Sequence, residues 1–151
     1  MTTPAKNRLF RTWTGIHRLV FTATKGRVAG RAMGMPVLML TTVGRKSGVP
    51  RKTMLTAPLE LGDTLVLAAS FGGDDSEPSW CRNLRKNPDV TVTMRGVERP
   101  MKARIASGDE RATLWPKLAE AHSNYAGYQT KTSRKIPLVL LEPVNPSAAA
   151  N

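Results

Sequence analysis

The residues best suited to chemistry lie in a glycine-bounded turn that follows a run of β-branched residues. From Thr41 to Arg51 the chain reads TTVGRKSGVPR, and its two glycines let the backbone turn tightly and approach a ligand closely. The turn presents donors at Arg45, Lys46, Ser47, Gly48 and Arg51. Such donors suit a phosphate or a cluster of carboxylates, and they equally suit an exposed hairpin turn whose charges face water. The GxxxxGK[ST] spacing of a P-loop is missing.

Positive charge is concentrated in the half of the chain that carries this turn. The net charge is +12, and residues 1–59 contain 11 Lys and Arg but no Asp or Glu. A polyanionic small molecule, an anionic membrane surface or a nucleic acid would each be attracted to such a segment. A nucleic acid is disfavoured, because only 5% of the residues are aromatic and none alternates with basic residues in a stacking pattern.

Length and cysteine content restrict the class of protein. A chain of 151 residues builds one hydrophobic core, and no apolar run approaches the ~18 residues that span a bilayer. The single cysteine, Cys81, excludes an internal disulfide and fits a reducing compartment, which predicts a cytoplasmic protein. We predict no metal, because no Cys/His cluster has ligand spacing.

The periodicity of apolar residues predicts strands interrupted by helices. Strands are expected over residues 36–43, 51–61, 64–70, 90–94, 99–106 and 136–141. The second of these strands should pair back on the first through the basic turn. The order lacks both the βαβ alternation and the GxGxxG fingerprint of a Rossmann domain, and it favours a small closed or half-open antiparallel barrel.

Helices are expected at three places. Residues 4–25 have the spacing of an amphipathic helix, and a short helix begins at Pro78. A longer helix runs to about Ala121, with Ser107 or Asp109 as its cap. The predicted organisation is a helix and glycine-rich connector over 1–30, one domain over 31–144 and a flexible tail over 145–151.

Several motifs in one order resemble a known family. The motifs are TTVGRKSGVPR over 41–51, AASFGG over 68–73, PSW over 78–80 and NLRKNPDV over 83–90, followed by a late tyrosine-bearing segment. They resemble the nitroreductases and quinone reductases that depend on the deazaflavin coenzyme F420. The resemblance implies an α+β split β-barrel of mostly antiparallel strands, like that of FMN-binding relatives, with flanking helices. It also implies hydride transfer from the reduced deazaflavin to a conjugated acceptor such as a quinone, an enone or a nitro compound.

The resemblance also implies roles for particular residues. The phosphate and oligoglutamate tail of the coenzyme would lie near the basic turn, from Arg45 to Arg51. The ring would lie near Ala68, Ala69 and Ser70, beside Trp80 and Asn83, although Trp80 fits a core anchor equally well. The substrate pocket would be lined by Tyr125, Tyr128, His122, Thr56 and Trp13. Tyr125 or Ser70 would stabilise the acceptor oxygen or relay a proton to it.

The chain departs from the family pattern at four positions. Phe71 stands where a lysine is common, and Cys81 where an aromatic residue is common. His122 and Thr56 stand where tyrosines often face the substrate. These changes weaken the expectation of nitroimidazole reduction and leave quinone or enone reduction open. Cys81 has no activating neighbour in the sequence, so we expect it to be structural.

Two other classes of function fit the same residues. A non-catalytic carrier could bind a fatty acid or lipid and hold its carboxylate at the basic turn, and an FMN-dependent oxidoreductase could use the same fold. The basic, amphipathic helix over residues 4–25 could pack on the barrel. It could also dock on the inner face of the membrane, where apolar quinones reside.

Overall fold

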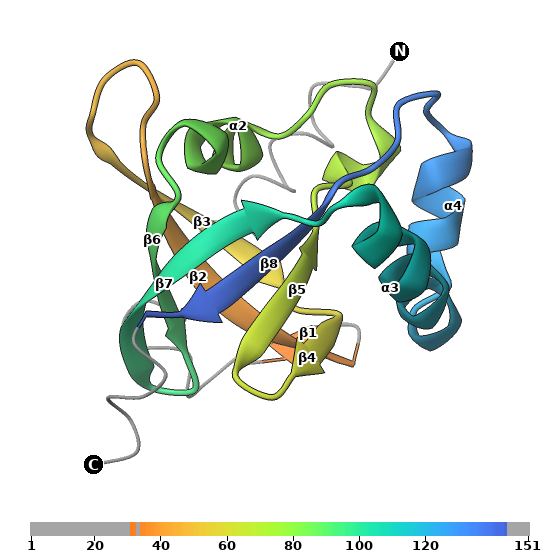
Figure 1. The fold of residues 1–151 in the computed structure, drawn as a ribbon, viewed down its shortest axis with the longest axis horizontal. Coiled ribbons are helices and arrows are strands. Elements are labelled where there is room, and N and C mark those ends of the chain that lie inside the picture. Colours follow the sequence, from red (N-terminus) through yellow and green to blue (C-terminus); the bar gives the residue numbers. More distant parts are fainter. Residues whose placement is uncertain (1–30, 33, 145–151) are drawn as a thin grey trace, which may run out of the picture.

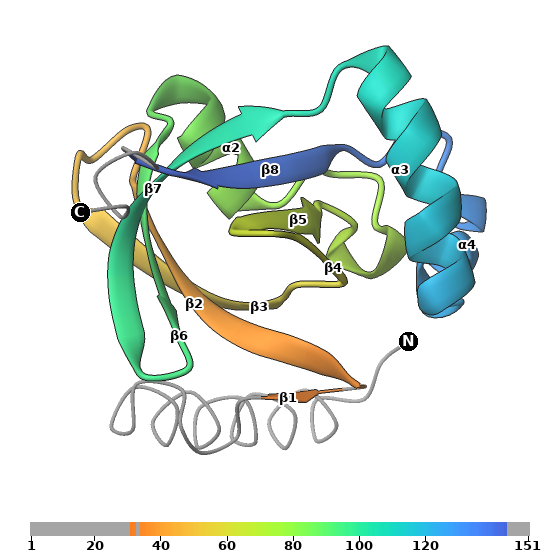
Figure 2. The same ribbon diagram turned by 60° about the horizontal axis from the view of Figure 1, so that its bottom comes forward.

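The computed structural model describes residues 31–32 and 34–144, and in this part of the chain eight strands form one sheet (Figure 1). The strands are β1 (Arg31–Ala32), β2 (Met35–Val43), β3 (Pro50–Thr56), β4 (Leu59–Leu61), β5 (Thr64–Ala68), β6 (Asp89–Met94), β7 (Val97–Ile105) and β8 (Leu138–Pro143). Their order is β1-β2-β6-β7-β8-β5-β4, with β3 paired to β2 alone, and every pairing is antiparallel. The sheet curls into a half-barrel (Figure 2), which confirms the predicted α+β split barrel.

The barrel is open between β3 and β5. The predicted strand over residues 51–61 is wrong, because the chain breaks after Thr56 and the segment Leu59–Leu61 pairs with β5 instead of β2. Pro58 lies at the break and has no N–H to donate to a sheet. The last hydrogen bond from this segment to β2 runs from the Ala57 N–H to the Pro36 carbonyl, at 2.9 Å. The sheet therefore splits at this point.

Within the described residues three α-helices flank the sheet: α2 (Ser79–Lys86), α3 (Gly108–Ala121) and α4 (Asn124–Thr130). Helix α2 packs against β2 and β7, while α3 and α4 lie together away from it (Figures 1 and 2). Ser107 is the cap of α3, because its hydroxyl accepts from the Glu110 N–H and the Glu110 carboxylate accepts from the Ser107 N–H. Helix α2 begins after Pro78 and ends before Asn87, as predicted.

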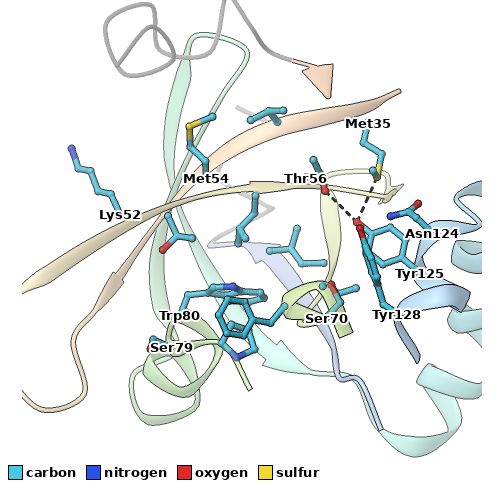
Figure 3. Close-up of a pocket in the computed structure, with 18 residues that line it drawn as sticks. Met35, Lys52, Met54, Thr56, Ser70, Ser79, Trp80, Asn124, Tyr125 and Tyr128 are labelled. Atoms are coloured by element: carbon cyan, nitrogen blue, oxygen red, sulfur yellow. Dashed lines mark hydrogen bonds between the residues drawn. The ribbon is translucent and has the colours of Figure 1, made fainter. Parts of the chain in front are cut away.

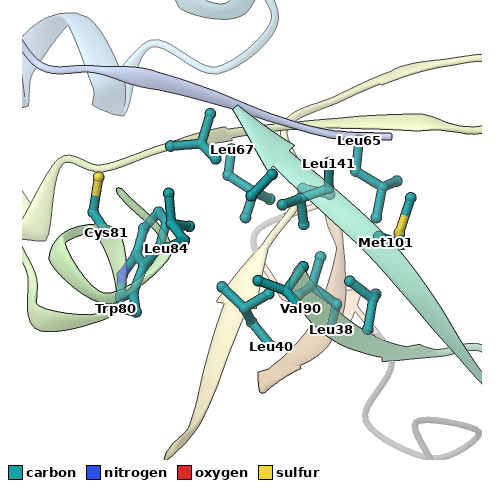
Figure 4. Packing of buried hydrophobic residues seen from close by; sticks show 14 of the residues in the cluster. Leu38, Leu40, Leu65, Leu67, Trp80, Cys81, Leu84, Val90, Met101 and Leu141 are labelled. Atoms are coloured by element: carbon teal, nitrogen blue, oxygen red, sulfur yellow. The ribbon is translucent and has the colours of Figure 1, made fainter. Parts of the chain in front are cut away.

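The core lies between the two halves of the curled sheet. Leucines from β2 and β5 meet Met101 of β7 and Leu141 of β8, and α2 closes one end with Trp80, Cys81 and Leu84 (Figure 4). Burial, followed by the nearby Glu77 carboxylate, raises the pKa of the Cys81 thiol to about 12. A thiol that stays protonated at neutral pH is a poor nucleophile, and this supports the structural role predicted for Cys81.

Some predicted features fall outside the described residues. The helix over residues 4–25, Trp13 within it, its contact with a membrane and the tail over 145–151 all stay predictions. The short strand Arg31–Ala32, which was not predicted, pairs with the start of β2. No helix in residues 31–32 and 34–144 is long and apolar enough to cross a membrane.

Candidate functional site

The split in the barrel opens into a cavity of about 750 Å³ (Figure 3). Strands β3 and β5 both line it, and because they are not hydrogen-bonded to each other their side chains leave room between them. The lining residues are Met35, Val37, Lys52, Thr53, Met54, Leu55, Thr56, Leu67, Ala68, Ser70, Phe71, Gly72, Pro78, Ser79, Trp80, Asn124, Tyr125 and Tyr128. The size and the mostly apolar lining are those of a small-molecule site.

The basic turn joins β2 to β3 and is closed by its own hydrogen bonds. The Gly44 N–H donates to the Val49 carbonyl at 2.9 Å, and the Gly48 N–H donates to the Gly44 carbonyl at 2.8 Å. The Ser47 hydroxyl accepts from the Val49 N–H at 3.2 Å. Gly48 has a φ of 69°, the left-handed region that favours glycine. The predicted tight turn is therefore present, and Lys46 and Arg51 are exposed on it.

Asn83 of α2 fixes this turn to the rest of the protein. Its Oδ1 accepts from the backbone N–H of Arg45 at 3.2 Å and from Arg45 Nη1 at 3.1 Å, and its Nδ2 donates to Thr42 Oγ1 at 3.2 Å. Lys86 Nζ adds a bond to the Arg45 carbonyl at 2.8 Å. Asn83 is buried and does not line the cavity. Its polar atoms hold the turn, so its predicted contact with a cofactor stays a prediction.

The cations of the turn lack carboxylate partners among the described residues. Arg45, Lys46, Arg51 and Lys52 form none of the ion pairs there, whereas Arg85, Arg95, Lys102 and Arg104 each pair with an acidic side chain. Lys52 also lines the cavity, and the sequence analysis did not select it. The position of Lys52 beside Arg51, at the start of the strand that leaves the turn, was the sequence feature that could have indicated it. A group of cations without carboxylate partners in this part of the chain, one of which lines the cavity, suits an anionic group.

Tyr125 lies at the other end of the cavity, on α4. Its hydroxyl is 3.1 Å from Thr56 Oγ1 and 3.6 Å from Met35 Sδ, and the residue is only 5% exposed (Figure 3). Burial raises the pKa of the Tyr125 phenol, against the opposing effect of the hydrogen bond with Thr56. Tyr128 packs edge-on against Tyr125, with ring centres 5.7 Å apart. The Tyr125 phenol is therefore a neutral donor beside the cavity at ordinary pH.

The segment after β5 carries Ser70 to the cavity wall. Arg134 holds this segment from behind, because its Nη2 donates to the carbonyls of Ala69 and Ser70 at 3.1 and 2.9 Å and its Nε donates to the Asp74 carbonyl at 2.8 Å. The Ala69 side chain is fully buried in the core and does not line the cavity. The structure thus presents Ser70 and Ala68 to a ligand and turns Ala69 away.

The structure brings a minority of the predicted site residues together at the cavity. Six of them line the cavity: Thr56, Ala68, Ser70, Trp80, Tyr125 and Tyr128. Trp80 is both a core residue and a wall of the cavity, so the two interpretations of it are compatible. His122 does not line the cavity and instead meets the Tyr125 ring edge-on, with centres 6.4 Å apart. No cluster of Cys, His, Asp or Glu in the described part of the chain could hold a metal ion.

The fold and the site define a split-barrel protein with an apolar cavity that runs from Lys52, beside the basic turn, to a buried tyrosine. The sequence model of the F420H(2)-dependent quinone reductase family matches residues 13–143, and the chain belongs to this family. It is therefore an oxidoreductase that depends on coenzyme F420. The sequence resemblance named both nitroreductases and quinone reductases, and the matching family is that of the quinone reductases.

Individual relatives agree with this assignment. An F420H(2)-dependent quinone reductase of Mycobacterium tuberculosis is 37% identical over 130 residues, which cover 83% of this chain and 87% of that protein. The solved structure of an F420-H2 dependent reductase, FDR-A, is 41% identical and matches with a TM-score of 0.63, over 71% of this chain and 94% of its own. A structure described as a domain-swapped dimer is 36% identical, with a TM-score of 0.66 over 91% and 99%.

The residues of the cavity fit the coenzyme. A flat ring with an anionic tail needs an apolar slot that ends near unpaired cations. The cavity leads from Ala68 and Trp80 to Lys52, which follows Arg51 of the basic turn in the sequence and forms no ion pair among the described residues. Arginine and lysine donors on a glycine-rich turn suit phosphate and carboxylate oxygens.

Proposed function

We propose that the protein reduces an apolar conjugated acceptor, above all a quinone, with reduced coenzyme F420 as the hydride donor. The observation that carries the proposal is a single cavity lined by Lys52, next to the basic turn, and by the buried Tyr125 at its other end. Membership of the quinone reductase family supports the choice of acceptor. Enones and activated nitro compounds are conjugated acceptors of the same kind and belong to the panel to be tested.

The anionic tail of the coenzyme lies, in this proposal, over the basic turn. Arg45, Lys46, Ser47, Gly48 and Arg51 provide the donors that the sequence resemblance implies, and Lys52 extends them into the cavity. Asn83 acts indirectly, by holding the Arg45 backbone and guanidinium in place.

The ring of the coenzyme lies against Ala68, Ser70 and Trp80 in this proposal. When bound, the reduced deazaflavin supplies a hydride. The apolar lining excludes water around the ring and strengthens each polar contact to the acceptor.

The acceptor lies between that ring and the tyrosines. Tyr125 stays protonated at neutral pH, because burial raises the pKa of its phenol. It donates a hydrogen bond to the acceptor oxygen, on which negative charge builds in the transition state, and it can pass a proton to that oxygen. Thr56 orients the Tyr125 hydroxyl at 3.1 Å, and the Ser70 hydroxyl offers a second donor on the same wall. Tyr128 supports the ring of Tyr125.

Fluorescence titration with oxidised coenzyme F420, followed by assays of the oxidation of the reduced coenzyme, tests the proposal. We expect tight binding and turnover above the protein-free background with menadione, with cyclohexenone and a nitroaromatic compound as further acceptors. Tight binding of a fatty acid without any turnover would favour the carrier function. A purified protein that carries a yellow flavin would favour the FMN-dependent enzyme.

A further inference from the structure

One cavity-lining residue has a backbone conformation that its side chain disfavours. Phe71 has a φ of 47°, and the other non-glycine residue with positive φ in residues 31–32 and 34–144 is Arg95. Arg95 lies with Gly96 in the tight turn between β6 and β7, where left-handed residues are expected. Phe71 also lies in a tight turn, Ser70–Gly73, with Gly72 at a φ of 64°, but this turn leads from β5 towards α2 and joins no hairpin. An aromatic residue in this region is uncommon and is strained.

The neighbours of Phe71 impose this conformation. The Gly73 N–H donates to the Ser70 carbonyl at 2.9 Å, and the Asp74 N–H donates to the Phe71 carbonyl at 3.1 Å. Arg134 holds the carbonyls on both sides of the turn. Gly73 is packed so closely that an added Cβ would lie 2.7 Å from the Tyr128 carbonyl oxygen. The backbone is thus fixed from two sides, and glycine or asparagine at position 71 would fit it with less strain.

The fold buries little of the Phe71 side chain. Phe71 is 60% exposed, the most exposed of the large apolar residues in the described part of the chain, although it lines the cavity. Strain that the surroundings maintain at a cavity wall is a sign of a functional contact. An exposed ring at the edge of an apolar cavity is available to a flat ligand.

We propose that Phe71 is a specificity residue that contacts the ring of an aromatic quinone acceptor. This inference rests on the proposed function. The neighbouring Ser70 lies between Trp80 and Tyr128, on the side of the cavity away from Lys52 (Figure 3). That position lies between the wall assigned to the coenzyme ring and the tyrosines assigned to the acceptor, on the side away from the cation at Lys52. The face-to-edge and stacked contacts of an aromatic ring select flat conjugated acceptors over small alicyclic ones.

The test compares wild type with Phe71→Tyr, Phe71→Leu and Phe71→Gly. The affinity of each protein for menadione is measured by calorimetric titration, which needs no turnover, and KM is measured for menadione and for cyclohexenone. In Phe71→Gly we expect menadione affinity to fall about 3- to 10-fold, as for loss of one aromatic contact. The menadione affinity of Phe71→Tyr should match that of wild type, and the affinity of Phe71→Leu should lie between those of wild type and Phe71→Gly. The KM for cyclohexenone and the Kd for coenzyme should not change, and the melting temperature of Phe71→Gly should be unchanged or higher.

Two results would overturn the inference. Weaker coenzyme binding with unchanged menadione affinity would make Phe71 a contact of the coenzyme. Equal losses for menadione and cyclohexenone, or a lower melting temperature in Phe71→Gly, would make its role structural. Failure of the proposed function is a separate result, because wild type would then bind menadione without oxidising reduced coenzyme.

Discussion

The two ends of the cavity hold their polar groups in opposite ways. At the basic end, Lys52 lines the cavity, and it is exposed like Lys46 and Arg51 of the neighbouring turn, whose backbone is fixed by Asn83. At the tyrosine end, the polar atom itself is buried, between Thr56 and Met35. Exposed charges attract an anion from a distance and are screened by salt, whereas a buried hydroxyl acts at short range in a low dielectric. We infer that the first end sets affinity for the coenzyme and the second sets the rate of reduction.

The largest effect is expected from Tyr125→Phe. Removal of the phenol takes away the donor to the acceptor oxygen, so kcat should fall about 100-fold. The coenzyme Kd should change little, because the interaction grows only in the transition state. Steady-state oxidation of the reduced coenzyme with menadione measures the first effect, and fluorescence titration measures the second.

Tyr128→Phe is the matched control, because it removes the neighbouring hydroxyl from the same helix and the same cavity. Its effect on kcat should be clearly smaller. A larger loss in Tyr128→Phe than in Tyr125→Phe would transfer the donor role to Tyr128.

The next largest effect is expected at the basic end. Arg45→Ala and Arg51→Ala should each weaken coenzyme binding by ~1–3 kcal/mol, as for a charge-assisted contact, while kcat at saturating coenzyme changes little. The affinity of wild type should fall with added salt, and that of the variants should fall less steeply. Lys102→Ala, which removes an exposed lysine of β7 outside the cavity lining, is the control. Unchanged affinity in both arginine variants would place the tail elsewhere.

Asn83→Ala should lower both the stability of the protein and its affinity for the coenzyme. The change leaves the Arg45 N–H and the buried Thr42 hydroxyl without their partner, so the free energy of unfolding should fall by about 1–2 kcal/mol. Coenzyme binding should weaken as a consequence. Asn83→Asp keeps the acceptor for Arg45 and should lose less. Urea denaturation of the two variants measures the difference, and equal stability of Asn83→Ala and wild type would contradict the role given to Asn83.

The smallest effect is a dependence of stability on alkaline pH. The folded protein holds the Tyr125 proton to higher pH than the unfolded chain, because burial raises the pKa of this phenol. Its contribution is complete below the ordinary tyrosine pKa of about 10 and is lost as pH rises through the raised folded-state pKa. Wild type should therefore lose more stability than Tyr125→Phe above about pH 10. Urea denaturation of both proteins at several alkaline pH values tests this, and parallel losses would show that Tyr125 is not the group responsible.

Sequence patterns of short range located most of the elements. The apolar run of β2, the alternation of β6 and the cap at Ser107 each depend on neighbouring residues, and the structure has all three. The tight turn with Arg45 and Arg51 was predicted for the same reason, because two glycines and the following strand lie within a few residues. The conjunction of motifs along the chain also determined the family.

Only the tertiary structure decided which of these residues face a common space. Asn83 meets Arg45 and Thr42 across some forty residues, and Ala69 turns into the core while Ser70 beside it reaches the cavity. Lys52 joins the site because β3 lacks a partner on its open edge, a result of where the chain breaks before β4. The strain at Phe71 depends on Arg134 and Tyr128, which are far away in sequence. Contacts of this kind depend on how distant segments pack, and local periodicity carries no record of that packing.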